Sequence, residues 1–529
     1  MPRAQKLYDD DDLDYEEEEY EEYEEEASPR RPPSLHLSGL SLGSPKPQPA
    51  ARKASAGTPS APRASPAEAR AARAAAPAPR ALQLPPPPAT RVLNLVVVGH
   101  VDAGKSTLSG RLLVECGVVS AQSIGKLKRE AAQANKGSFA YAWVLDEDAS
   151  ERARGITVDV ARAQLKTQSY DVNLLDTPGH RDFVPEMISG AAQADAALLV
   201  TNASPGEFEK GLNAQTREHI TLCRSLGVRN ALVVVNQMDK VAYSQQAFER
   251  LMAELAPVLA AAGFPPASVR YVPCAAFHGD NVTRPSEQLP WWGGPSVRDA
   301  IEALPPPRRD TASPARATVL DCYKSRLAGG GALTLLVRVN AGALRPKDQL
   351  LLLPAGELVV VKALAVGGEP AAALVDGECG EVAVAPAGGG GSTLEVLSPQ
   401  PGWVLSAAHA PAALATEIEA RVQCLQLRRP LVKGDVVELH SHCALAPAVV
   451  SRIVCLLDAR GAVVPTPGAD GGKGRPRCLR SAEHAIIRVR LSEGPICIET
   501  FGACAALSRF SLRAGSETLL VGAVTAIVS

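Results

Sequence analysis

Long apolar runs and closely spaced cysteines are absent from the sequence. Its apolar runs, such as residues 231–235, are far shorter than the roughly 20 residues that a membrane-spanning helix needs. The 11 cysteines are scattered without paired short spacings, so neither a disulfide framework nor a zinc site is indicated. The first residues also lack the basic stretch followed by an apolar stretch that marks a secretory signal. We therefore expect a cytoplasmic protein without membrane segments.

Net charge is also nearly absent, at -2, but the charges are unevenly distributed. Residues 1–26 contain 14 acidic and 2 basic residues, whereas residues 27–90 contain 9 basic residues and 1 acidic residue. The near-neutral remainder gives little indication of nucleic-acid binding, so any RNA contact is expected from a local patch or from the tail. Because residues 1–90 contain few large apolar side chains, they are predicted to be a disordered extension, either a solubilising tail or a binding arm.

From residue 91 onward, short β-branched runs alternate with helical patterns. Strands are expected at residues 92–98, 172–176, 196–202 and 231–236, and helices at residues 106–116, 215–226 and 246–262. Continuous apolar strands of this kind are typical of a parallel sheet covered by helices on both faces. Residues 91–306 are therefore predicted to form a doubly wound, mostly parallel α/β domain.

Beyond residue 314 the helical patterns fade, and short apolar strands separated by glycine turns take over. Examples are residues 334–339, 349–353 and 358–365. A pattern of many short strands is typical of β-barrels. The sequence thus predicts two all-β barrel domains, at residues 314–405 and 413–529.

The first strand is followed by GHVDAGKST, which satisfies the phosphate-loop pattern G-x-x-x-x-G-K-[ST] between a strand and a helix. Backbone N–H groups of such a loop surround the β-phosphate, Lys105 reaches the β- and γ-phosphate oxygens, and Ser106 offers its hydroxyl to Mg²⁺. The predicted phosphate-binding residues are Gly99, His100, Val101, Asp102, Ala103, Gly104, Lys105, Ser106 and Thr107.

Two further motifs follow later strands. DTPGH begins at Asp176, which is expected to hold Mg²⁺ through water, while the N–H of Gly179 bonds the γ-phosphate and makes this loop a switch. NQMD supplies Asn236 and Asp239, and the Asp239 carboxylate can accept from the two N–H donors of guanine. Each motif alone is unspecific, but their order, each after a strand, predicts a protein that binds GTP and GDP with Mg²⁺.

At this point residues 91–529 resemble the family of translational GTPases that includes elongation factor 1-alpha, the eukaryotic release-factor GTPase and the HBS-like ribosome-rescue GTPase. FAYAWVLD at residues 139–146 and ERARGIT at residues 151–157 look like the first switch of this family. SRFSLR at residues 508–513 looks like the ending of its third domain.

The resemblance implies roles for four residues around the γ-phosphate. Thr157 would bind Mg²⁺ and sense the γ-phosphate, and His180 would position the attacking water when ribosomal RNA orders it. Val101 and Ile156 match the apolar gate that flanks this histidine. The implied enzyme is a ribosome-stimulated GTPase that hydrolyses GTP to GDP and phosphate.

Within the family, SFAYAWVLDE, HVDAGKST and the acidic extension look closest to the HBS-like subgroup. That subgroup implies a monomer that delivers a Pelota-like factor to the A site of a stalled ribosome and releases it after GTP hydrolysis. Two alternatives stay open, namely a release-factor GTPase that binds release factor 1 and an elongation factor 1-alpha-like carrier of aminoacyl-tRNA. A sulfate-activation GTPase with a similar nucleotide domain is the least favoured.

The guanine half of the site departs from the family. Gln237 replaces the lysine of N-K-x-D, whose ammonium normally braces the phosphate loop, and Cys274, Ala275 and Ala276 replace the usual S-A-x. These four positions, with Asn236 and Asp239, are nevertheless the expected base-binding residues. The departures also leave open a nucleotide-dependent adaptor with little turnover.

Two polar groups outside these motifs are further candidate sites. HSHC at residues 440–443 resembles a metal cluster, but we favour a barrel strand with exposed His440 and His442 because no further ligand stands nearby in sequence. Arg308 and Arg309 could contact RNA, although paired arginines on a surface are usually only solvated.

Overall fold

The computed structural model describes residues 91–146, 151–152, 157–208, 214–324, 333–388, 398–458, 460–467, 473–474 and 476–529. All of these residues belong to one compact unit. The predicted disordered extension, residues 1–90, lies outside the described residues, as does Ile156. None of the described helices is long and apolar enough to cross a membrane.

The first domain is built on a six-stranded sheet. Its strands, in spatial order, are β2 (Ala161–Lys166), β3 (Tyr170–Asp176), β1 (Arg91–Val98), β4 (Ala196–Asn202), β5 (Asn230–Asn236) and β6 (Val269–Pro273). Its helices are α2 (Lys105–Glu115), α3 (Ala121–Gln133), α5 (Val184–Ala192), α7 (Ala214–Leu226), α8 (Gln245–Ala261) and α9 (Val297–Glu302). Only β2 runs antiparallel to its neighbour, so the predicted mostly parallel α/β sheet is confirmed.

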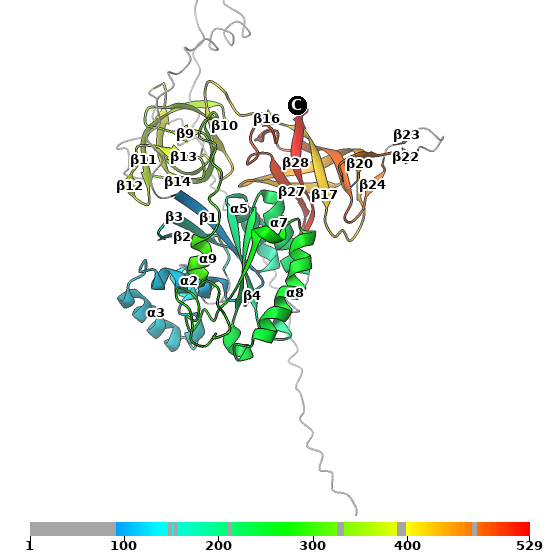
Figure 1. Ribbon diagram of the computed structural model, residues 1–529. Helices are drawn as coiled ribbons and strands as arrows, with labels where there is room; N and C mark the ends of the chain where they lie inside the picture. The colour runs from blue at the N-terminus through cyan, green and yellow to red at the C-terminus, as the bar shows by residue number, and fades with distance from the viewer. Residues whose placement is uncertain are drawn as a thin grey trace, which may run out of the picture. The chain divides into compact units, whose positions relative to one another are not determined.

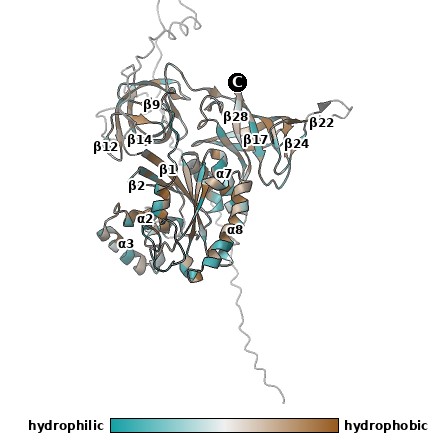
Figure 2. Ribbon diagram, in the orientation of Figure 1, coloured by the Kyte–Doolittle hydropathy of each residue, from teal (hydrophilic) through white to brown (hydrophobic). Residues whose placement is uncertain are grey.

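Alternate residues of the strands point to opposite faces of the sheet. In β1, Val96 and Val98 join a core formed with α5, α7 and α8, whereas Leu95 and Val97 join a core formed with α2 and α9. Figure 1 shows these two groups of helices on opposite sides of the sheet, and Figure 2 colours β1 as apolar. Because both faces are covered, the carboxyl ends of the strands are left to form a site.

The remaining described residues form two closed β-structures, each with its own apolar core. The second domain contains β10 (Gln349–Leu353), β15 (Val404–Ala407), β7 (Arg316–Tyr323), β8 (Leu333–Ala341), β14 (Cys379–Pro386), β11 (Glu357–Val366) and β12 (Glu369–Pro370), and β10 pairs with β11 to close it. The third contains β19 (Val436–Ser441), β27 (Arg509–Ala514), β28 (Glu517–Ile527), β17 (Glu417–Cys424), β25 (His484–Leu491), β20 (Ala444–Leu457) and β21 (Val463–Val464), closed by β19 and β20. The two predicted barrels are confirmed as a fold class, while their exact boundaries stay predictions.

Short strand pairs complete the β-domains. They are β9 (Ala343–Leu344) with β13 (Leu374–Val375), β16 (Leu414–Ala415) with β26 (Ile496–Cys497), β18 (Leu431–Val432) with β24 (Cys478–Leu479), and β22 (Thr466–Pro467) with β23 (Lys473–Gly474).

The expectation of exposed histidines in the third domain was wrong. His440 is 5% exposed and His442 is 7% exposed, and a ring nitrogen of His442 lies 3.1 Å from the carbonyl oxygen of Cys497. Both rings therefore pack inside the domain. Within the described ranges, no three His, Cys, Asp or Glu side chains are grouped so that they could hold a metal ion.

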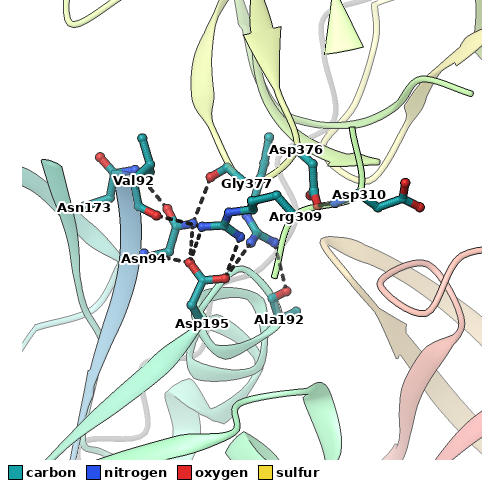
Figure 3. A network of polar contacts seen from close by, with 10 residues as sticks. Val92, Asn94, Asn173, Ala192, Asp195, Arg309, Asp310, Asp376 and Gly377 are labelled. Carbon is teal, nitrogen blue, oxygen red and sulfur yellow. Dashed lines mark hydrogen bonds and ion pairs between the residues drawn. The ribbon is translucent and has the colours of Figure 1, made fainter. Parts of the chain in front are cut away.

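A polar network joins the first domain to the second at the amino ends of β1 and β4 (Figure 3). Both guanidinium NH groups of Arg309 donate to Asp195, each over 2.7 Å. Asn94 donates to Asp195 from its backbone and its side chain, each over 2.9 Å, and its side chain also donates to the carbonyl of Gly377. Arg309 therefore forms an interdomain ion pair, whereas the sequence favoured a solvated surface arginine at this position.

Candidate nucleotide site

The phosphate loop connects β1 to α2 in a backbone conformation that requires glycine. Gly99 has φ 152° and Gly104 has φ 84°. A Cβ atom on Gly99 would lie 2.2 Å from the carbonyl oxygen of Val200, and one on Gly104 would lie 2.5 Å from Nδ2 of Asn236. The loop can therefore lie this close to β4 and β5 only with glycine at both positions.

The same loop leaves the first N–H groups of α2 available. The helix begins at Lys105 after Gly104, and no side chain caps its N-terminus. Uncapped N–H donors at a helix N-terminus attract anions, and phosphate is the anion that this arrangement commonly holds. The predicted phosphate-binding residues thus form a loop from Gly99 to Gly104 and the start of α2 from Lys105 to Thr107.

Lys105 places its ammonium group inside this turn. The side chain is buried, and Nζ donates to the carbonyl oxygen of His100 over 2.9 Å. Burial lowers the pKa of Lys105, although the nearby carboxylates of Asp176 and Asp102 oppose this effect. A phosphate group would supply the counter-charge that this buried ammonium otherwise draws from carboxylates.

Hydroxyl and carboxylate oxygens converge beside the turn. Ser106 Oγ lies 3.1 Å from Thr157 Oγ1, and Thr157 Oγ1 donates to Asp146 over 3.4 Å. At the end of β3, both carboxylate oxygens of Asp176 are buried and have no hydrogen-bond partner. The structure thus brings together all three predicted magnesium ligands, and it adds Asp146, which was not predicted.

The electrostatics of this group fit a divalent cation. Burial raises the pKa of Asp176 to about 6. Burial, together with Asp176 and Glu151, raises the pKa of Asp146 to about 7. Carboxylate and hydroxyl oxygens are the ligands that Mg²⁺ prefers, and a cation would relieve the mutual repulsion of the carboxylates. The residues present therefore fit the magnesium ion that phosphate-loop proteins use.

Gly179 lies directly on the phosphate loop. A Cβ atom at this position would lie 2.3 Å from Lys105 Nζ and 3.0 Å from the carbonyl oxygen of Gly99. The carbonyl group of Gly179 accepts a hydrogen bond from Nε2 of Gln215 at the start of α7. The DTPGH loop is thereby connected both to the ammonium of Lys105 and to a second helix, a link that the sequence did not predict.

His180 is turned away from this cluster. It precedes the short helix η3 (Arg181–Phe183), its Nδ1 accepts from the backbone N–H of Asp182 over 3.3 Å, and its side chain is 46% exposed. Val101, the neighbouring residue of the predicted gate, is half-buried. The structure therefore holds the predicted catalytic histidine in a solvent-facing position. Its side chain would have to rotate inward to reach a water molecule beside the γ-phosphate.

Asn236 braces the loops of the guanine half. Its Nδ2 donates to the carbonyl oxygen of Ala103 over 2.9 Å, and its Oδ1 accepts from the N–H of Ala276 over 3.0 Å. The carbonyl oxygen of Cys274 accepts from the N–H of Met238, and burial raises the pKa of the Cys274 thiol. Asn236 thus links the phosphate loop to residues 274–276, including the buried Ala275, so that its amide is engaged with backbone groups.

Gln237 braces the phosphate loop, which is the role expected of the lysine that it replaces. Its Nε2 donates to the carbonyl oxygen of Asp102 over 2.9 Å. Asp239 follows in the short helix η4 (Met238–Val241), where its carboxylate is 27% exposed and lies 3.7 Å from Nε2 of His278. The carboxylate is therefore accessible at the edge where a base would bind.

Comparisons with known proteins agree with this geometry. Residues 90–339 match the family described as Elongation factor Tu GTP binding domain, and residues 417–525 match GTP-eEF1A C-terminal domain-like. The chain is 37% identical over 441 residues to Protein HBS1 of Drosophila melanogaster, covering 82% of this chain and 63% of that protein. It is 34% identical over 438 residues to elongation factor 1-alpha of Entamoeba histolytica, covering 82% of this chain and 95% of that protein.

Among solved structures, the GTPase-like domain of S. cerevisiae Ski7 bound to GTP has a TM-score of 0.68 and 17% identity to this chain. The likeness covers 83% of this chain and 98% of that one. At this identity it supports the three-domain fold alone.

Proposed function

Because the chain belongs to the family of translational GTPases that contains elongation factor 1-alpha and HBS1, we propose that it delivers a Pelota-like factor to stalled ribosomes. GTP hydrolysis then releases the factor. The ribosomal RNA is the trigger, and the chain acts as a monomer. The identity to HBS1 and the acidic extension favour this subgroup over a release-factor GTPase that binds release factor 1.

The observation that carries the proposal is the group formed by Ser106, Thr157 and Asp176 beside Lys105. In the proposed reaction, Lys105 binds the β- and γ-phosphates, and the N–H of Gly179 binds the γ-phosphate. Ser106, Thr157 and Asp176 would hold Mg²⁺, which when bound would supply positive charge to the phosphate oxygens. Asp239 selects guanine.

Hydrolysis requires a water molecule aligned with the γ-phosphate. We assign this positioning to His180, whose exposed ring can rotate inward once its contact with Asp182 is replaced by a contact with ribosomal RNA. Val101 limits the path of that rotation. With His180 in this exposed position, we expect slow turnover without the ribosome.

Capture of the partner in defined nucleotide states tests the proposal. The chain is immobilised with GDP or with a non-hydrolysable GTP analogue and offered Pelota, release factor 1 and aminoacyl-tRNA together. We expect Pelota to bind in the GTP-analogue state and to be lost with GDP. Nucleotide-dependent capture of release factor 1 instead would move the chain to the termination subgroup.

A second candidate function is a nucleotide-dependent adaptor with little turnover, suggested by Gln237 in place of lysine. The hydrogen bond from Gln237 to Asp102 favours ordinary nucleotide affinity. If the chain still captures Pelota but releases less than one phosphate per ribosome encounter, the result would support the adaptor function.

A further inference from the structure

Three arginines come together where the end of α7 meets the start of β27. Arg224 lies in the last turn of α7, Arg229 directly precedes β5, and Arg509 is the first residue of β27. Gly227, with φ 118°, lies between the first two, and a Cβ atom there would lie 2.6 Å from NH1 of Arg509. Glycine therefore lets Arg509 pack against the loop that carries the other two side chains. We call Arg224, Arg229 and Arg509 the arginine triad.

The arginine triad has no counter-charge of its own. Within the described ranges, none of its three side chains forms an ion pair with a carboxylate. Burial lowers the pKa of Arg509, and the positive charges of Arg229 and Arg224 lower it further. By contrast, the buried Arg316 donates to Glu499 from Nε over 3.2 Å and from NH2 over 3.0 Å. The triad thus lacks the negative charge that neutralises Arg316, and a bound anion would supply it.

The guanidinium groups of the triad also keep free hydrogen-bond donors. Nε of Arg224 donates to the carbonyl oxygen of Gly263 over 2.9 Å, and its NH1 donates to that of Val228 over 3.3 Å. NH1 of Arg509 donates to the carbonyl oxygen of Ala505 over 3.3 Å. The NH2 groups of both arginines have no partner among the described residues, and neither group is fully buried. These donors are therefore open to a ligand from solvent.

Two aromatic rings hold the guanidinium planes in place. Cζ of Arg224 lies 5.5 Å from the ring centre of Phe264, and Cζ of Arg509 lies 5.4 Å from that of Phe501. An arginine stacked on a ring has a fixed orientation, and its N–H edge remains available. Phe264 is 3% exposed and belongs to the core, whereas Phe501 is 52% exposed. A ring that is half open to solvent thus lies beside the triad.

These two features together favour one class of ligand. Oriented guanidinium groups without a counter-charge suit phosphate oxygens, which arginine commonly binds through two N–H groups. A free phosphate ion would leave the exposed ring of Phe501 unused. Single-stranded RNA carries phosphates in series and also unpaired bases, which stack on exposed aromatic side chains. RNA would therefore use both the triad and the ring.

We propose that the arginine triad and Phe501 form a binding site for single-stranded RNA, in which the guanidinium groups bind backbone phosphates and a base stacks on Phe501. Arg229 lies at the amino end of β5, whereas the nucleotide site lies at the carboxyl ends of the strands. The RNA site is therefore separate from the nucleotide site. It goes beyond the proposed function, because neither GTP nor Pelota takes part in it.

Binding of the full chain to a labelled oligouridine of about 12 nucleotides, measured by fluorescence anisotropy at several salt concentrations, tests the site. On single strands, the logarithm of the binding constant falls with the logarithm of the salt concentration by about 0.7 per phosphate contact. We expect Arg229→Gln and Arg509→Gln each to reduce the slope by about this amount.

Arg429→Gln is the matched control, because it removes the same charge from a side chain that is already neutralised. NH1 of Arg429 donates to both carboxylate oxygens of Asp435, each over 3.1 Å. This variant should keep the slope of the wild type. Residues 27–90 contain 9 basic residues, but they are the same in every variant, so the differences between variants report on the triad.

Phe501→Leu tests the stacking contact separately from the charges. The variant keeps an apolar side chain but loses the ring, so it should weaken binding to the oligouridine about fivefold and leave the salt slope unchanged. Duplex RNA of the same length offers no unpaired base. The duplex should therefore bind more weakly than the single strand, and Phe501→Leu should not affect its binding.

The proposal is overturned if the wild type does not bind the oligouridine, if Arg229→Gln keeps the slope of the wild type, or if Arg429→Gln reduces it equally. Polyglutamate that competes as well as RNA of equal charge would also overturn it and indicate an acidic protein partner. If Arg509→Gln does not fold, the exposed Arg229 and Phe501 decide the test. The assay contains no GTP, ribosome or Pelota, so its failure would leave the proposed function untouched.

Discussion

At the scale of single residues, Asp176 carries a buried carboxylate. Water would normally stabilise the charge of such a group, but the burial of Asp176 excludes it. Its pKa is raised from 3.8 to about 6, so the folded chain binds a proton more readily than the unfolded chain. This contribution to stability is fully present below about pH 4 and is lost as the pH rises through about 6. Above that range the buried charge destabilises the chain unless a cation neutralises it.

Asp176→Asn should therefore raise the free energy of unfolding of the nucleotide-free chain in chelator at pH 7.5, by roughly 1 to 3 kcal/mol. The stability of this variant should also change less between pH 4 and pH 6. Thermal unfolding across this pH range measures both effects. Asp182→Asn, at a side chain that is 66% exposed, should leave the profile unchanged. A lower unfolding midpoint for Asp176→Asn at pH 7.5 would contradict the account.

Asp239 allows a test of base recognition. Its carboxylate is expected to accept from two N–H donors of guanine, whereas an asparagine would present one donor and one acceptor, which suits xanthine. Asp239→Asn should weaken GDP binding by at least about tenfold, which is the usual penalty for an unpaired polar group. The variant should instead favour xanthosine diphosphate. Competition between the two nucleotides measures the preference, and an unchanged preference for GDP would remove Asp239 from the base site.

At the scale of elements, the strongly apolar segments of the first domain were predictable. The expected strands lie within β1, β3, β4 and β5, because central strands covered on both faces consist of continuous apolar runs. β2 was not predicted, since it is an edge strand with the mixed sequence ARAQLK. α5 was also missed, because its nine residues include a proline in the first turn and a glycine near the end.

The interdomain network also belongs to this scale. Asp195 is 12% exposed and Arg309 is 20% exposed, so Asp195→Ala would leave a largely buried guanidinium without its partner. The expected loss is about 3 kcal/mol in the free energy of unfolding, measured with urea. Arg298→Ala should cost under about 0.5 kcal/mol, because Arg298 and Asp299 form an ion pair that is about half exposed. Equal losses from the two variants would contradict the structural role of Asp195.

At the scale of the whole molecule, the motifs located the site, but they did not reveal how its parts are connected. Ser106 and Asp176 were predictable because each belongs to a motif that follows a strand, and Thr157 was expected from the resemblance of residues 151–157 to the first switch of the family. Contacts such as Arg309 with Asp195, or Arg513 with Glu218, join residues more than a hundred positions apart whose types are common on any surface. Their pairing depends on how the domains fold together, which no local pattern contains.

Asn236 illustrates the same limit. Its motif predicted a contact with the base, but the structure engages its amide with Ala103 and Ala276. Gln237 departs from the lysine of the family motif, yet its side chain makes the bracing contact with the carbonyl oxygen of Asp102. Residue identity predicted that these side chains lie in the guanine-binding loop. Only their geometry showed that they bond to backbone groups of Ala103, Ala276 and Asp102.

If the proposed function is correct, turnover of this GTPase depends on the ribosome and on His180. Phosphate release from GTP, measured in single turnovers with and without ribosomes for wild type and His180→Ala, tests this claim most directly. We expect ribosomes to accelerate the wild type at least about a hundredfold, and His180→Ala to lose most of this acceleration while binding GTP normally. Equal ribosome-stimulated rates for the two proteins would contradict the claim.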